Sequence, residues 1–125
     1  MVQQVDVRQL SAARGAGAVV IDVREPYEYA SGHVPGALSI PMHLVPLRVD
    51  EIPSDRDVYV VCAGGNRSWQ VCHYLSQRGI EAINVTGGTD SWKAAGFATD
   101  TAPASAVVYV LGRAPSRPTP APRTS

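Results

Sequence analysis

Residues 57–79 read DVYVVCAGGNRSWQVCHYLSQRG and contain three patterns in succession. Residues 57–62 form a valine-rich apolar run without polar alternation, which is typical of a strand covered on both faces of a parallel sheet. A short loop with two glycines follows. From residue 66 or 67 to Arg78 the apolar residues recur at helical spacing, and Gly79 is a suitable C-terminal cap. The segment therefore predicts a strand, a tight loop and a helix.

The same alternation continues on both sides of this segment. Shorter apolar runs that predict strands lie at residues 2–5, 19–22, 37–40 and 81–85. Helices are predicted at residues 7–14, with Asp6 as N-terminal cap, and at residues 25–30, with Pro26 in the first turn. Repeated strand and helix units in a short chain predict an α/β fold with a central, mainly parallel sheet and helices on both faces.

Composition and charge exclude several classes of protein. The chain has 125 residues, and its 11 Lys and Arg balance its 11 Asp and Glu. A general nucleic-acid binder usually has a basic excess, so we expect no nucleic-acid partner. The sequence has no apolar stretch of the ~20 residues that cross a membrane, and no signal-peptide pattern. Two cysteines cannot form a disulfide framework. We therefore expect a cytoplasmic protein without a membrane partner.

The sequence pattern divides the chain into one domain and a shorter C-terminal extension. Residues 1–100 have the size and patterning of one domain. Residues 101–125 form a C-terminal extension with three Arg and no acid. Its apolar run, residues 106–111, is expected to pack on its own chain, since six apolar residues in a row are unfavourable in water. The Pro-rich remainder, residues 113–125, is predicted to be disordered.

Cys62 is the residue best placed for chemistry. It follows a predicted parallel strand, and ligands of α/β sheets bind at the carboxyl ends of the strands. Backbone N–H groups of the loop and the helix N-terminus favour a thiolate there. Gly64 and Gly65 are expected to supply positive φ values, and Arg67 a cation for a bound anion or for a supporting carboxylate. These features predict a nucleophilic cysteine; the alternative is a buried cysteine that only packs.

The segment Cys62-Ala63-Gly64-Gly65-Asn66-Arg67-Ser68 resembles the Cys-x-x-Gly-x-Arg-Ser loop of the rhodanese-like sulfurtransferases. Residues 21–37 resemble the family's N-terminal signature, with Asp-x-Arg followed by Gly-His-Val-Pro-Gly-Ala. Residues 85–96 resemble its C-terminal signature, Gly-Gly followed by Trp and Gly. The resemblance covers about residues 3–98 and is that of a single-domain member.

The resemblance implies an enzyme of the thiosulfate:cyanide sulfurtransferase class, without a cofactor or a metal. Cys62 would take a sulfane sulfur from thiosulfate or a persulfide, carry it as a persulfide, and pass it to a thiol or cyanide. The loop residues would hold the terminal sulfur through their backbone amides: Ala63, Gly64, Gly65, Asn66 and Arg67. A partner protein carrying a persulfide is a further candidate donor. The alternative function is a rhodanese-like binding or sulfur-delivery module without turnover.

Loop length and nearby charges refine this expectation. Cys62 and Arg67 are separated by four residues, one fewer than in the Cys-x5-Arg loop of protein tyrosine phosphatases, so the loop suits one sulfur atom better than a phosphate. Ala63 and Glu28 stand where some family members that prefer thiosulfate have basic residues. Thiosulfate is therefore expected to be a poor donor.

Four other polar residues have structural interpretations. Asp22 and Arg24 are expected to fix the loop that follows their strand, and His33 to be a hydrogen-bonded structural residue. Cys72 is expected to be a packed thiol, with a resolving role left open. The cysteines and histidines lack the spacing of a zinc site.

Overall fold

A computed structural model describes residues 1–101 of the chain. A five-stranded sheet in the order β1-β5-β4-β2-β3 forms its centre, and every strand pair is parallel. The strands are β1 (Gln3–Val5), β2 (Val19–Asp22), β3 (Leu38–Ser39), β4 (Val58–Val61) and β5 (Ala82–Val85). All five strands predicted from the apolar runs are confirmed, and the sheet has the predicted parallel arrangement.

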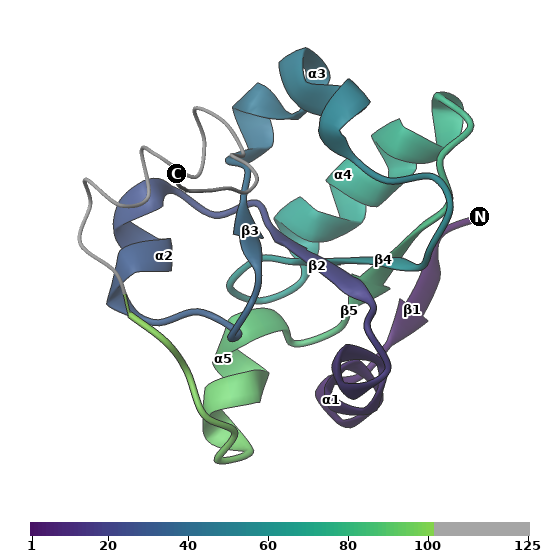
Figure 1. Cartoon of the computed structure of the whole chain (residues 1–125). Helices are drawn as coiled ribbons and strands as arrows, with labels where there is room; N and C mark the ends of the chain where they lie inside the picture. Colours follow the sequence, from purple (N-terminus) through teal and green to yellow (C-terminus); the bar gives the residue numbers. More distant parts are fainter. Residues whose placement is uncertain (102–125) are drawn as a thin grey trace, which may run out of the picture.

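Helices cover both faces of the sheet, as predicted (Figure 1). Residues of α1 (Val7–Gly15), α2 (Pro26–Ser31) and α5 (Gly88–Ala94) pack in one hydrophobic cluster. Residues of α3 (Val45–Arg48) and α4 (Asn66–Gln77) pack in the other. Within β4, Tyr59 and Val61 face the first cluster, whereas Val58 and Val60 face the second. This alternation explains the continuous apolar run, because both faces of the strand are buried.

Three helices confirm the sequence prediction closely. Asp6 caps α1 by accepting a hydrogen bond from the Gln9 N–H at 2.9 Å, and the Asp6 N–H donates in turn to Gln9 Oε1 at 2.9 Å. Pro26 opens α2. The buried face of α4 consists of four residues at helical spacing: Ser68, Val71, Cys72 and Leu75. Local capping and periodicity therefore account for these elements.

Two helical regions were not predicted from the sequence. Residues 42–51 form α3 between two 3-10 turns, η1 (Met42–Leu44) and η2 (Val49–Glu51). Pro46 interrupts the helical pattern there and Pro41 directly precedes it, so tertiary packing decides the conformation. The second region, α5, begins with glycines, which have low helix propensity. Its position beside the Cys62 loop explains why it forms, as described below.

The predicted C-terminal extension lies outside the described residues, apart from Thr101. Among the described residues, no helix is long and apolar enough to span a membrane. The same residues contain no group of three or more His, Cys, Asp or Glu side chains arranged to hold a metal ion.

Candidate active site

Cys62 lies directly after β4, the middle strand of the sheet, and is only 1% exposed. Parallel pairing places the ends of β2 and β5 beside it, since Asp22 aligns with Val61 and Asn84 with Val60. The three segments that carry the family resemblance follow these three strands. The sheet order therefore brings them together at one edge.

The loop residues 62–65 curl around the Cys62 sulfur. The Gly65 N–H donates to Cys62 Sγ at 3.0 Å, and Ser68 Oγ lies 3.3 Å from the same sulfur. Gly65 is the N-terminal cap of α4, with φ of 111° in the left-handed region. Gly64 has no positive φ, so the prediction for that glycine is wrong. The Gly64 N–H is instead one of the groups that lower the pKa of Cys62.

The surroundings of Cys62 stabilise its thiolate. Burial by itself raises the pKa of the thiol. Hydrogen bonds from the Ser68 hydroxyl, the Ser68 N–H and the N–H groups of Gly65 and Gly64 outweigh burial and hold the pKa below its ordinary value. The N-terminus of α4 adds positive potential at the same point. The second cysteine, Cys72, has no such donors, and burial raises its pKa to about 12. Only Cys62 is therefore a candidate nucleophile.

Helix α5 orients the loop from the outside. The Thr89 N–H donates to the Cys62 carbonyl at 2.8 Å, and the Asp90 N–H donates to the Ala63 carbonyl at 3.0 Å. Because a trans peptide unit directs its C=O and N–H to opposite sides, the N–H groups of Ala63 and Gly64 point away from α5. A Cβ at Gly88 would lie within 3.0 Å of both accepting carbonyl oxygens. The close approach of α5 to the loop therefore requires glycine at position 88.

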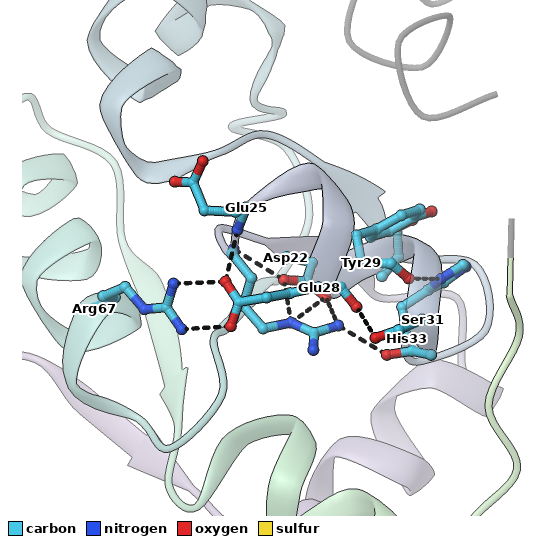
Figure 2. A network of polar contacts seen from close by, with 10 residues as sticks. Asp22, Glu25, Glu28, Tyr29, Ser31, His33 and Arg67 are labelled. Atoms are coloured by element: carbon cyan, nitrogen blue, oxygen red, sulfur yellow. Dashed lines mark hydrogen bonds and ion pairs between the residues drawn. The ribbon is translucent and has the colours of Figure 1, made fainter. Parts of the chain in front are cut away.

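Arg67 forms an ion pair with a carboxylate. Its Nη1 and Nη2 atoms donate to Glu28 Oε1 and Oε2 at 2.9 and 3.0 Å, and Figure 2 shows the two planar groups facing each other. The hydrogen bond from Arg67 lowers the pKa of Glu28 to about 2, and the same pair raises the pKa of Arg67. Arg67 was expected to contact either a bound anion or a supporting carboxylate. In the structure it contacts a carboxylate, that of Glu28.

Asp22 and Arg24 form a buried structural pair, as predicted. Arg24 Nη2 donates to Asp22 Oδ2 at 2.8 Å and to the Gly32 carbonyl at 2.9 Å, which ties β2 to the end of α2. His33 stacks on Tyr29 and contacts the Tyr29 carbonyl through Nδ1 at 2.8 Å. Since a carbonyl can only accept, this nitrogen carries the proton. Asp22, Arg24 and His33, all from the first signature, thus have structural contacts.

Asn84 was not identified from the sequence. It is 2% exposed, lies on β5, and faces α4. Its Oδ1 accepts from Ser68 Oγ at 2.5 Å, and its Nδ2 donates to the Gly65 carbonyl at 3.3 Å. The sequence does distinguish Asn84, because it is the single polar residue in the apolar strand Ala82–Val85. Of the two tryptophans, Trp92 is buried in the core, whereas Trp69 is exposed and stacks on His73.

Residues 6–95 match the Rhodanese-like domain family. The chain belongs to this family. It is 44% identical to a sulfurtransferase of Allochromatium vinosum over 95 residues, which cover 74% of this chain and 89% of the relative. It is 30% identical to a thiosulfate sulfurtransferase of Stutzerimonas stutzeri, covering 73% and 84% of the two chains.

Solved structures support the same assignment. A rhodanese-related protein from Thermoplasma volcanium superposes with a TM-score of 0.76 at 30% identity, covering 80% of this chain and 99% of that one. A rhodanese-like domain protein from Staphylococcus aureus gives a TM-score of 0.73 at 32% identity, covering 81% and 99%. The rhodanese-like fold predicted from the sequence is therefore confirmed.

Proposed function

We propose that the chain is a rhodanese-type sulfurtransferase that works through a persulfide on Cys62. The observation that carries the proposal is the environment of the Cys62 sulfur, where the Gly65 N–H and the Ser68 hydroxyl lie within 3.3 Å at the end of the central strand. These groups favour a thiolate, which is the nucleophilic form of cysteine. The relatives named above are themselves called sulfurtransferases.

The reaction has two balanced steps. The Cys62 thiolate attacks the outer sulfur of thiosulfate, the S–S bond breaks, and sulfite leaves with its electron pair. Cys62 then carries a persulfide anion. A thiolate or cyanide attacks the terminal sulfur, forms a new bond to it, and releases the Cys62 thiolate. A persulfide donor follows the same course and leaves as a thiolate.

The loop would hold the persulfide through backbone groups. The Gly65 N–H donates to the sulfur, and the N–H groups of Gly64 and Ser68 help to lower the pKa of Cys62. The proposed cradle also includes Ala63, Asn66 and Arg67. No metal or cofactor has a role in these steps. The expected setting is the cytoplasm, because both cysteines, Cys62 and Cys72, are free thiols and reducing compartments keep them so.

Replacing Cys62 tests the proposal. Cys62→Ser should lower thiocyanate formation from thiosulfate and cyanide at least about a thousandfold, since the nucleophile is lost. The matched control is Cys72→Ala, which removes the other thiol from the buried face of α4 and should leave activity within about threefold. Intact-mass spectrometry should show one added sulfur, about 32 Da, on the unmodified chain and on Cys72→Ala alone.

Three results would contradict the proposal or redirect it. Activity retained in Cys62→Ser would exclude Cys62 as the sulfur carrier. Failure of the unmodified chain to acquire sulfur from either thiosulfate or cysteine persulfide would exclude sulfur transfer. Loading of one sulfur without multiple turnovers, with every acceptor tried, would instead favour the delivery-module alternative.

A further inference from the structure

The Glu28–Arg67 pair leaves the Cys62 loop, residues 62–68, without an unpaired cation of its own. Arg67 is the only charged residue between positions 62 and 68. Both of its terminal nitrogens are engaged by Glu28, and the two side chains are 35% and 20% exposed. Glu28 Oε1 also accepts the Glu25 N–H at 2.9 Å, so the carboxylate is held from two sides (Figure 2). The contact is therefore a fixed part of the site.

A second guanidinium, that of Arg24, follows the neighbouring strand β2. Arg24 is 4% exposed and is committed to Asp22 and to the Gly32 carbonyl. Asp90, whose N–H binds the Ala63 carbonyl, is an exposed acidic residue in the first turn of α5. Each of the two guanidinium groups is thus paired with a carboxylate, Arg24 with Asp22 and Arg67 with Glu28. The remaining attraction for an anion comes from backbone N–H groups and the start of α4.

Charge matters differently for the two kinds of sulfur donor. Attack of the Cys62 thiolate on thiosulfate, ⁻S–SO₃⁻, brings three negative charges together and releases sulfite. Attack on a protonated alkyl persulfide, R–S–SH, brings one negative charge and releases R–S⁻, with the proton staying on the transferred sulfur until solvent removes it. Coulomb attraction to an unpaired guanidinium would therefore favour the thiosulfate reaction more.

We propose that the Glu28–Arg67 ion pair makes Cys62 selective for a sulfane sulfur carried by a thiol, as in an alkyl persulfide, over dianionic thiosulfate. This inference rests on the proposed sulfur transfer. Glu28 is then a specificity-determining residue that acts through Arg67. The near-complete burial of Cys62 agrees with such a donor, because a persulfide presents its sulfane sulfur at the end of a narrow chain.

The test removes the negative charge and keeps the shape. Glu28→Gln retains an oxygen for the Glu25 N–H and leaves the Arg67 guanidinium with its full charge. We expect kcat/KM for thiosulfate to rise about tenfold, which corresponds to about 1.4 kcal/mol. The value for cysteine persulfide should change by less than about threefold, because its reacting form lacks the second charge.

Two matched variants distinguish the effect of the Glu28 charge from the effect of a disturbed Cys62 loop. Glu25→Gln removes the same charge three residues earlier, from a carboxylate that has no ion pair within residues 1–101, and should leave both donors unchanged. Glu28→Asp keeps the charge but shortens the side chain, and it should not raise the thiosulfate rate. An equal gain in either variant, or an equal change for both donors in Glu28→Gln, would overturn the proposal.

A second route does not disturb the ion pair. Ala63→Lys places a new cation beside Cys62 at a partly exposed position whose carbonyl, rather than its side chain, binds α5. It should also raise kcat/KM for thiosulfate selectively, and the absence of any gain would count against the inference even if Glu28→Gln does not fold. Absence of transfer from every donor in the unmodified chain would instead refute the proposed function.

Discussion

The Ser68 hydroxyl has one proton and two acceptors within reach, Cys62 Sγ and Asn84 Oδ1. The orientation of the Asn84 amide follows from its neighbour, because the Gly65 carbonyl can only accept and must face Nδ2. Oδ1 is therefore the group that faces Ser68. When Cys62 is a thiol, Ser68 donates to Asn84; when Cys62 ionises, the same proton is available to the sulfur. Ser68 and Asn84 thus position a proton next to the nucleophile.

This arrangement predicts the effect of removing the hydroxyl. Ser68→Ala should raise the pKa of Cys62, because the side-chain donor is the largest favourable contribution to the thiolate. The fraction of thiolate at neutral pH then falls, and alkylation becomes slower. The measurement is the rate of alkylation of Cys62 against pH, followed by peptide mass spectrometry, with the deeply buried Cys72 as internal reference. A midpoint for the unmodified chain at or above ~8.5 would refute the proposed environment.

At the scale of elements, the Cys62 loop depends on two helices that approach it from opposite ends. Helix α4 begins at the loop and supplies N–H groups to the sulfur, whereas α5 binds the loop carbonyls. Gly87 and Gly88 have φ values of 75° and 56°, and Gly88 has no room for a side chain. The sulfur cradle is therefore assembled by the packing of α5 as much as by the loop sequence.

Gly88→Ala should displace α5 from the loop and lower the sulfur-transfer rate at least about tenfold, since small shifts in the loop misplace the reacting groups. Gly96→Ala is the matched control. Gly96 also has positive φ, at 84°, but a Cβ there would meet nothing within 4 Å. That variant should lose about 1 kcal/mol of stability and keep its rate constant. Equal loss of rate in both variants, assayed below their melting temperatures, would show that α5 does not position the loop.

At the scale of the whole molecule, the strand order joins segments that are distant in sequence. Glu28 follows β2 and Arg67 follows β4, and these two strands are neighbours. Their ion pair therefore exists only in the folded state. It links the stability of the protein to pH, because the pKa of Glu28 is about 2 when folded and 4.5 in its ordinary state.

The sign of this pH dependence follows from the lowered pKa. The pair contributes its full stability above pH about 4.5, and the contribution is lost as the pH falls toward about 2. Urea unfolding should show Glu28→Gln less stable than the unmodified chain at pH 7, and the difference should shrink between pH 4.5 and pH 2.5. A difference that stays constant over this range would mean that the carboxylate charge does not stabilise the fold.

Local patterns in the sequence were sufficient for most of the fold. The five strands, helices α1, α2 and α4, and the position of Cys62 at a strand end all follow from apolar runs, caps and helical spacing. These features depend on residues that are close together in the sequence, so they can be recognised without a structure. The Cys62 loop motif likewise identifies the family from the sequence alone.

Tertiary structure alone decided the contacts that complete the site. Helix α5 forms against local propensity because its N–H groups bind the Cys62 loop, and Gly64 turned out to serve through its N–H rather than through a positive φ. The partner of Arg67 is 39 residues away in the chain, and that of Ser68 is 16 residues away. Sequence spacing does not encode such pairs, because the order of strands in the sheet determines which side chains meet.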